Sequence, residues 1–222
     1  MAALRCLVRQ VQQKEKPVSA MFSRGVLMSL NCCVNHFTER NRDDHMTDSL
    51  QFGADAQVNH TLVVLREQKV DIAISDGASL VPGTLLSVDR EGDISGRCTS
   101  GEGALLRLDY TVQKRPRWLA LHLSLGGVNL RGSTLLGVVC KSRASEASTF
   151  RVCLRSSTPS GFIDAFLPKD VVSFAKDSTH IDLLRLDGNP DVPGQADWRD
   201  LILFFQPTPA SFEIRDLRVF IV

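Results

Sequence analysis

From Val58 onward, the chain is a series of short runs in which apolar and polar residues alternate, separated by Gly, Pro, Ser and Asp. In the run ALLRLDYTV, residues 104–112, most apolar side chains fall on one face, while Arg, Asp and Thr fall on the other. This period of two is typical of strands with one buried and one solvent-facing side. A succession of such runs predicts an antiparallel β-sandwich or barrel and disfavours alternating strands and helices.

The expected strands number about nine or ten. The clearest are residues 58–65, 69–75, 104–112, 117–125, 133–142, 149–156 and 180–186, followed by two terminal runs. Another run follows the Pro-Gly turn at residues 82–83. The stretch GFIDAFLPKDVVSF fits either an irregular strand or a short turn of helix.

The terminal stretch DWRDLILFFQPTPASFEIRDLRVFIV contains two apolar runs around a Pro-rich turn. In the second run, Phe212 and Ile214 keep one phase of the alternation, whereas Leu217 and Val219 keep the other. One residue is therefore added at Arg215-Asp216, which predicts a β-bulge. The run LILFF is apolar on both faces and predicts a central strand covered on both sides, with the N-terminal segment as one candidate cover.

The N-terminal part of the chain differs from the rest in charge. Residues 1–42 carry 7 Lys+Arg and 2 Asp+Glu, which leaves 26 − 7 = 19 basic and 25 − 2 = 23 acidic residues for the remainder. We predict a basic N-terminal extension, residues 1–45, before a sandwich domain, residues 46–222. The extension is expected to be poorly ordered or partly helical. A targeting or phosphate-binding arm is the alternative.

Composition fits a soluble globular protein, with 43% hydrophobic residues and a formal net charge of +1 over 222 residues. No run approaches the roughly 20 apolar residues of a membrane-spanning helix. The signal-like run GVLMSLNCCV, residues 25–34, is short and lacks a clear cleavage site. A cytoplasmic protein is therefore expected.

The six cysteines are Cys6, Cys32, Cys33, Cys98, Cys140 and Cys153. They form no CxxC pair, and half of them lie in the extension, so reduced, buried thiols are expected. A disulfide between Cys140 and Cys153 is the alternative if their strands are neighbours.

Four stretches together resemble the galactose-binding-like jelly-roll sandwich that is common among carbohydrate-binding modules. They are GALLRLDYTV, RPRWLALHLSLGG, FRVCLRS and the terminal stretch, in which Trp198, Ile214, Asp216, Leu217 and Val219 occupy the family's anchor positions. The resemblance spans residues 84–222, with a beginning at Val58 as the alternative. It implies an all-β, antiparallel two-sheet sandwich that binds glycans without cleaving them, often with a structural calcium ion.

A candidate ligand site follows from the alternation of polar residues. If their strands share a sheet, six side chains form one polar face: Arg107, Asp109, Trp118, His122, Arg151 and Arg155. Arginine can bind hydroxyl, carboxylate or phosphate groups with two parallel hydrogen bonds, and Trp118 can stack on a sugar ring. The alternative is a solvated outer face with cross-strand ion pairs. Trp198 is expected to anchor the core or the sheet edge.

For metal, the loop DGNPD offers Asp187, Asn189 and Asp191 at every second position, as a calcium loop would. It lacks the Gly and Glu that an EF-hand requires at its sixth and twelfth positions. The loop DREGD, residues 89–93, is a second oxygen-rich segment. Ordinary solvated turns are the alternative for both, because turns favour the same residues.

Catalytic signatures are missing from the sequence, which has no G-x-S-x-G, H-E-x-x-H or phosphate-binding loop. The basic run QKRPRW, residues 113–118, is isolated and fits a hairpin tip better than a nucleic-acid site. We therefore expect a non-catalytic module that binds a carbohydrate or another polar ligand. The alternatives are a structural or protein-interaction sandwich and a glycan-active hydrolase. An open polar face favours ligand binding, and a covered one favours interaction.

Overall fold

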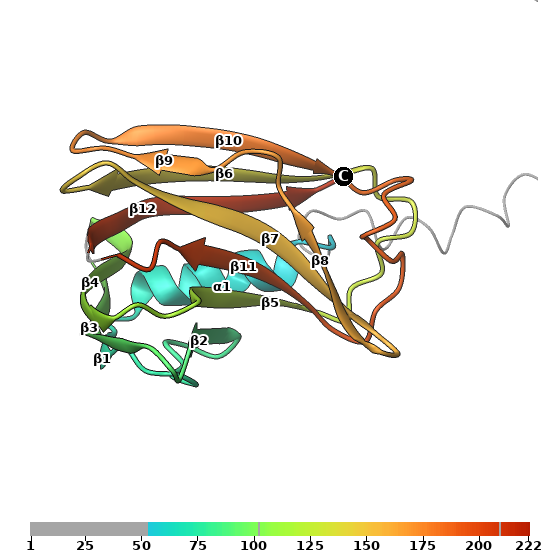
Figure 1. Ribbon diagram of the computed structural model, residues 1–222. Helices are drawn as coiled ribbons and strands as arrows, with labels where there is room; N and C mark the ends of the chain where they lie inside the picture. Colours follow the sequence, from blue (N-terminus) through green and yellow to red (C-terminus); the bar gives the residue numbers. More distant parts are fainter. Residues whose placement is uncertain (1–52, 102, 209) are drawn as a thin grey trace, which may run out of the picture. The chain divides into compact units, whose positions relative to one another are not determined.

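The computed structural model describes residues 53–101, 103–208 and 210–222, which form two antiparallel β-sheets packed face to face (Figure 1). Sheet A has the strand order β1-β3-β4-β12-β6-β10. Sheet B has the order β2-β5-β11-β7-β8, with β9 also paired to β7. The predicted all-β sandwich is confirmed. The predicted extension, residues 1–45, lies outside the described residues.

The strands are β1 (Asp71–Ala73), β2 (Thr84–Val88), β3 (Asp93–Gly101), β4 (Ala104–Lys114), β5 (Leu119–Gly126), β6 (Leu135–Ala144), β7 (Ser148–Thr158), β8 (Gly161–Phe166), β9 (Val171–Ser173), β10 (Ser178–Arg185), β11 (Arg199–Phe205) and β12 (Ala210–Ile221), and the helix is α1 (Ala56–Glu67). The ambiguous stretch GFIDAFLPKDVVSF thus contributes two short strands, β8 and β9.

Alternation places the core between the sheets as the sequence predicts. Leu108 of β4, Leu121 of β5 and Leu154 of β7 are all buried in one apolar cluster. Three phenyl rings pack together within the core. Their centroids lie 5.5 Å apart for Phe150 and Phe205 and 5.3 Å apart for Phe150 and Phe212. Each large side chain removed from water contributes about 1.5–3 kcal/mol, so the two sheets are held together mainly by apolar burial.

Strand β11 is central in sheet B, because it pairs with β5 on one side and β7 on the other. Leu201, Ile202 and Leu203 are fully buried, as the run LILFF predicts. Leu201 and Leu203 belong to the main core, whereas Ile202 belongs to a second, small apolar cluster packed with Phe166 and Phe204. Side chains of sheet B itself therefore help to cover the outer side of this strand.

The predicted bulge in β12 is present. The pairing of β12 with β6 shifts register between Ile214 and Asp216. Ile214 before the shift and Leu217 after it are both buried in the core. The extra residue thus keeps the apolar side chains of both halves of the strand pointing inward.

The segment VNHTLVVL, expected to be the first strand, is instead most of helix α1. Its buried residues are Val58, Thr61, Leu62 and Leu65, which follow the spacing i, i+3, i+4, i+7 of one helical face. The strand prediction was wrong because a short apolar run fits both periods, and one of the four buried positions is the polar residue Thr61.

Helix α1 contacts β5 of sheet B and β3, β4 and β12 of sheet A, so it fills the space between the sheets along one side (Figure 1). The registered pairing between β4 and β12 ends at Ile214. Beyond Ile214, the Asn59 side chain of α1 pairs with the β12 backbone. Its Nδ2 donates to the Val219 carbonyl at 2.7 Å, and its Oδ1 accepts from the Val219 N–H at 3.3 Å. The side-chain amide thereby substitutes for the missing neighbour strand.

Cys98, Cys140 and Cys153 are buried free thiols, as expected for the part of the chain that the structure describes. Cys140 lies in sheet A and Cys153 in sheet B, so the alternative disulfide is not formed. Burial raises the pKa of each of the three thiols to about 12. Within the described residues, no helix is both long and apolar enough to cross a membrane.

Candidate functional site

The outer face of sheet B brings together aromatic and charged side chains from four adjacent strands. Cross-strand register places Asp200 of β11 opposite Arg155 of β7, and Arg155 opposite Asp164 of β8. It also places Phe204 opposite Arg151, and Cys153 opposite Phe166. We call this surface the sheet B face, and it comprises Trp118, His122, Arg151, Arg155, Phe162, Asp164, Phe166, Asp200 and Phe204.

The floor of the sheet B face is apolar. Ala120, Cys153 and Ile202 point outward by alternation yet are fully buried, because Phe166 and Phe204 pack over them. The rings of Phe166 and Phe204 lie 5.8 Å apart. Because Phe166 and Phe204 pack against these three buried side chains, their rings have little freedom to move, which favours a preorganised surface.

Polar and charged side chains on the sheet B face are held in pairs. His122 Nδ1 lies 3.0 Å from Asp200 Oδ2. Arg155 donates from Nε and Nη2 to the two oxygens of Asp164, both at 2.7 Å. This bidentate contact raises the pKa of Arg155. The Arg155 guanidinium and the Asp164 carboxylate are thereby held in fixed orientations. Fixed orientations are what recognition of a hydroxyl group by paired hydrogen bonds requires.

Arginine also stacks on the aromatic rings of this face. The guanidinium carbon of Arg151 lies 3.9 Å from the ring centroid of Phe166, and that of Arg155 lies 3.9 Å from Phe162. Such cation–π contacts orient both partners. Phe162 remains 55% exposed, so one side of its ring is open to a ligand.

Trp118 immediately precedes β5, and its position in the alternation places it on the same side as His122. Its Nε1 donates to Ser87 Oγ of the neighbouring strand β2 at 3.1 Å, and Arg117 packs near its ring at 4.9 Å. Trp118 is half-buried. A tryptophan whose polar edge is fixed by a hydrogen bond can present its ring without rotating.

Trp198 precedes β11 and is 40% exposed, so it is no core residue. The next residue, Arg199, is fully buried and donates to Val128 O at 3.1 Å, to Pro193 O and to Ser156 Oγ. Burial lowers the pKa of Arg199. Arg199 therefore ties two loops to sheet B and fixes the strand end from which Trp198 projects.

Four of the six predicted ligand residues share the sheet B face: Trp118, His122, Arg151 and Arg155. Arg107 and Asp109 belong to β4, which lies in sheet A, so the expectation of a single patch of six was wrong. Alternation reveals which side chains share a face of one strand, but it does not reveal which sheet the strand joins. Whether the four bind a ligand stays a prediction.

Sequence reasoning missed several residues of the sheet B face, namely Asp200, Phe204, Phe162, Asp164 and Phe166. The last three lie at every second position of β8, within the stretch GFIDAF. The alternation of Phe and Asp in this stretch indicates a strand, and it would have placed these three side chains on one face.

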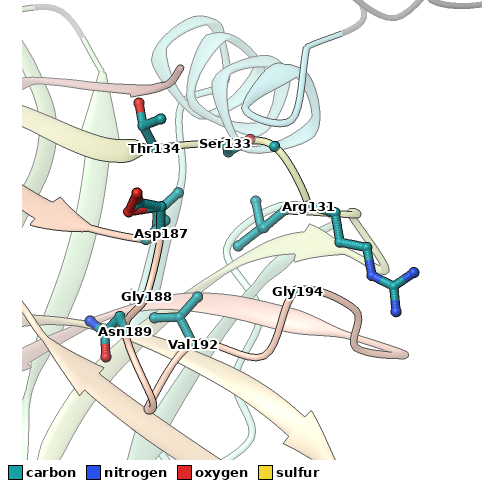
Figure 2. Close-up of a pocket in the computed structure, with 11 residues that line it drawn as sticks. Arg131, Ser133, Thr134, Asp187, Gly188, Asn189, Val192 and Gly194 are labelled. Atoms are coloured by element: carbon teal, nitrogen blue, oxygen red, sulfur yellow. The ribbon is translucent and has the colours of Figure 1, made fainter.

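The predicted calcium loop follows β10 and lines a depression of about 410 Å³ together with Arg131 and Thr134 (Figure 2). Asp187 accepts hydrogen bonds from Arg185 Nε at 3.2 Å, and Asn189 Oδ1 accepts from the N–H of Asp191 at 3.0 Å. These contacts are those of a hydrogen-bonded turn. In the described ranges, no three His, Cys, Asp or Glu side chains gather to hold a metal. Calcium at Asp187, Asn189 and Asp191 stays a prediction.

The second oxygen-rich loop, DREGD, is organised by an ion pair. Asp89 is almost fully buried and accepts from Arg117 N at 2.9 Å, from Arg117 Nε at 2.9 Å and from Arg117 Nη2 at 3.0 Å. Hydrogen bonds from Arg117 hold the pKa of Asp89 well below its usual range. This carboxylate therefore fastens the loop before β5, next to Trp118.

Solved structures with a similar fold include three carbohydrate-binding modules. A CBM4 module, at 11% sequence identity, covers 68% of this chain and 95% of its own, with a TM-score of 0.46. The family 11 module of Clostridium thermocellum, in complex with a β-1,3-1,4-mixed-linked tetrasaccharide, is 15% identical and covers 69% of this chain and 97% of its own, with a TM-score of 0.44. The CBM22-1 xylan-binding domain of Paenibacillus barcinonensis Xyn10C is 10% identical and covers 70% and 95%, with a TM-score of 0.42.

No protein-family model and no curated protein matches the sequence. All three structures belong to the class that the sequence resembles. Their identities of 10 to 15% and TM-scores of 0.42 to 0.46 assign no function to this chain.

Proposed function

We propose that the protein is a non-catalytic module that binds a carbohydrate on the sheet B face. One observation carries the proposal: aromatic rings and hydrogen-bonded charged groups alternate over four adjacent strands on the solvent side of one sheet. Trp118 and Phe162 offer ring surface, and Asp200, Asp164 and Arg155 lie between them.

A sugar has an apolar C–H face and a rim of hydroxyl groups, and the sheet B face offers a partner for each. Aromatic rings pack against the C–H face. Hydroxyl groups can donate to the carboxylates of Asp200 and Asp164 and accept from His122 and Arg155. Because the charged groups are already fixed in pairs, little side-chain entropy is lost when a sugar binds.

Binding without cleavage is favoured because the carboxylates on this face are hydrogen-bonded to neighbouring side chains and its one thiol is buried. Arg155 bonds both oxygens of Asp164, and Asp200 is engaged by His122, so both carboxylates have structural partners. The thiol of Cys153 is fully buried and its pKa is raised to about 12, the opposite of an activated nucleophile. We propose recognition alone as the role of these residues.

The proposal is tested by a glycan array followed by calorimetric titration of the strongest binder. We expect Trp118→Ala to weaken binding about tenfold, the loss that removal of a stacking ring produces. Phe220→Ala, an aromatic truncation on the outer face of sheet A, is the matched control and should bind like the wild type.

The thermal midpoint of both variants shows whether their folds are intact. Absence of binding to every glycan of the array by a folded wild-type protein contradicts the proposal. A collapse of the midpoint in Trp118→Ala would instead assign the residue to the core, and Phe162→Ala, at an exposed ring, then carries the same test.

A second function, contact with another polypeptide, is favoured by a different observation. Strand β10 forms one edge of sheet A and exposes Ile181 and Leu183, while Val172 and Phe174 are exposed beside it. Apolar side chains gathered at a sheet edge are typical of protein contacts. Analytical ultracentrifugation of Ile181→Lys against the wild type tests self-association at this edge.

A further inference from the structure

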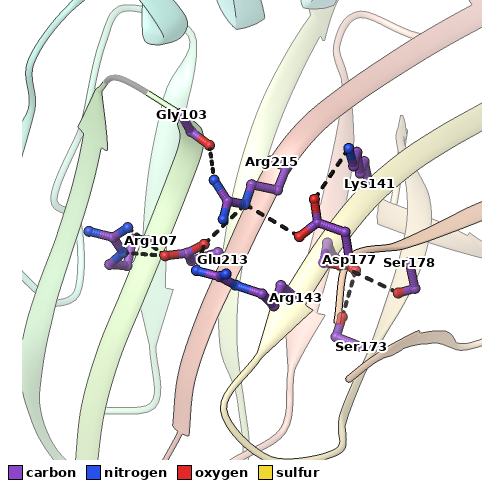
Figure 3. A network of polar contacts seen from close by, with 10 residues as sticks. Gly103, Arg107, Lys141, Arg143, Ser173, Asp177, Ser178, Glu213 and Arg215 are labelled. Atoms are coloured by element: carbon purple, nitrogen blue, oxygen red, sulfur yellow. Dashed lines mark hydrogen bonds and ion pairs between the residues drawn. The ribbon is translucent and has the colours of Figure 1, made fainter. Parts of the chain in front are cut away.

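A second group of charged side chains lies on the outer face of sheet A, away from the sheet B face. Register places Arg107 of β4 opposite Glu213 of β12, and Glu213 opposite Arg143 of β6. Arg215, the unpaired residue in the bulge of β12, reaches the same carboxylate (Figure 3). We call Arg107, Arg143 and Arg215, gathered around Glu213, the arginine cluster.

Each arginine of the cluster contacts the one glutamate. Arg107 donates from Nε to Glu213 Oε1 at 2.9 Å and also from Nη2. Arg143 Nη2 donates to Oε2 at 3.0 Å, and Arg215 Nε lies 3.2 Å from the same oxygen. The Glu213 side chain is only 11% exposed. The carboxylate thus acts as a buried anchor for three guanidinium groups.

Positive charge exceeds negative charge in this region. Asp177 lies 3.2 Å from Lys141 Nζ and 3.6 Å from Arg215 Nε. With Lys141 and Asp177 included, four cations surround two carboxylates, a balance of 4 − 2 = +2. The excess is concentrated on one side of one sheet, in a protein whose whole net charge is +1.

Many hydrogen-bond donors of the cluster remain available. An arginine has five N–H donors, and Arg143 uses one of them on Glu213. The side chains of Arg107 and Arg143 are 45% and 41% exposed, so their remaining donors can face solvent. Arg215 Nε is buried and has no well-aligned acceptor, although two carboxylates lie near it. The cluster therefore has spare donors in fixed positions.

The anchor stays charged under ordinary conditions. Burial alone would raise the pKa of Glu213, but the hydrogen bond from Arg107 and the charges of all three arginines outweigh burial and lower the pKa. An ionised Glu213 keeps the three guanidinium groups aligned and offsets only one of their three positive charges. This is the preorganisation that lets an anion bind without first ordering long side chains.

There is also space beside the cluster. Arg107 lines a depression of about 450 Å³ with Lys69, Thr99 and Ser100. Asp71 also lines it, and Arg97 Nε donates to that carboxylate at 2.7 Å. A ligand in the depression would thus meet Lys69 and Arg107 as cations and the Thr99 hydroxyl as an additional donor, whereas Ser100 donates its hydroxyl proton to the Gln68 carbonyl at 2.7 Å.

We propose that the arginine cluster is an anion-binding site for sulfate or phosphate monoester groups carried by a ligand. Planar guanidinium groups bind such tetrahedral oxyanions with two parallel hydrogen bonds. The site is separate from the sheet B face, and the proposal does not depend on sugar binding there.

Three polymers serve as probes: dextran sulfate, unsulfated dextran and polyphosphate, each titrated calorimetrically at about 0.15 M salt, where diffuse attraction is screened. We expect at least one polyanion to bind more tightly than unsulfated dextran, which offers no anion to the arginine cluster. Arg143→Gln should weaken that binding about tenfold, the effect of losing a charge-assisted contact. Dextran sulfate and polyphosphate distinguish a sulfate ester from a phosphate ester as the natural group, and either result supports the site.

The matched control is Arg185→Gln, which removes the same charge from an exposed position elsewhere in sheet A. It should change the affinity less than about twofold if binding is local. Arg143→Lys keeps the charge but lacks the planar fork, so it should restore only part of the affinity. Equal losses in Arg143→Gln and Arg185→Gln, or no binding of either polyanion, would overturn the proposal.

Removing Arg143 leaves the buried Glu213 with fewer partners and could unfold the protein. If the melting temperature of Arg143→Gln falls markedly, Arg143→Gln combined with Glu213→Gln removes the buried charge as well. The double variant should fold and should still lose polyanion binding. Retained binding in the folded double variant would count against the arginine cluster.

Discussion

At the scale of single residues, arginine is the side chain that organises this protein. Arg155 is fixed by Asp164 on the sheet B face, Arg117 by Asp89 at a turn, and Arg199 by backbone carbonyls in the interior. Alternation in the sequence predicted that Arg151 and Arg155 face away from the core. It could not predict their partners, because each carboxylate comes from a different strand or loop.

The Asp89 carboxylate provides a test of this organisation through pH. Its pKa is lowered from the ordinary value of 3.8, chiefly by hydrogen bonds from Arg117. The native state therefore releases this proton more readily than the unfolded state. The stabilisation is complete above pH 3.8 and is lost as the pH falls further, towards the native pKa.

We predict that Asp89→Asn lowers the melting temperature at pH 7 and that the difference from wild type shrinks below pH 3.8. Differential scanning calorimetry between pH 7 and about 2.5 measures the first part of this decrease. Asp191→Asn, at an exposed loop position, is the control for loss of a surface charge. A difference between Asp89→Asn and wild type that stays constant with pH would contradict the assignment.

At the scale of elements, the strands were largely predictable and the helix was not. Runs such as residues 104–112 correspond to β4 because alternation with one dry face is a strong signal over several residues. Residues 58–65 were misassigned since their apolar positions suit a helix as well as a strand. Only tertiary contacts, with β5 on one side and β12 on the other, decide between the two.

Asn59 is the residue by which α1 replaces a strand beside β12. We predict that Asn59→Ala lowers the free energy of unfolding by about 1–3 kcal/mol, because the N–H and carbonyl of Val219 lose their partner. Urea denaturation measures the loss. His60→Ala, at an exposed position of the same helix, should be close to neutral, and equal effects of both variants would argue against the pairing.

At the scale of the whole molecule, the two sheets present different chemistry to solvent. The outer face of sheet B combines aromatic rings with paired polar groups, while that of sheet A carries the arginine cluster, where positive charge exceeds negative charge. The sequence predicted one polar patch from six residues, since it contains no signal for the sheet to which each strand belongs. β4 and β5 follow each other in the chain, yet they lie in different sheets.

The division between the two faces makes the proposed carbohydrate site open to a direct measurement. An NMR titration of ¹⁵N-labelled protein with the best glycan of the array records every perturbed amide. We predict that the largest shifts fall on β5, β11, β7 and β8, together with the indole N–H of Trp118. Shifts confined to sheet A or to its loops, with the amides of sheet B unchanged, would contradict carbohydrate binding on the sheet B face.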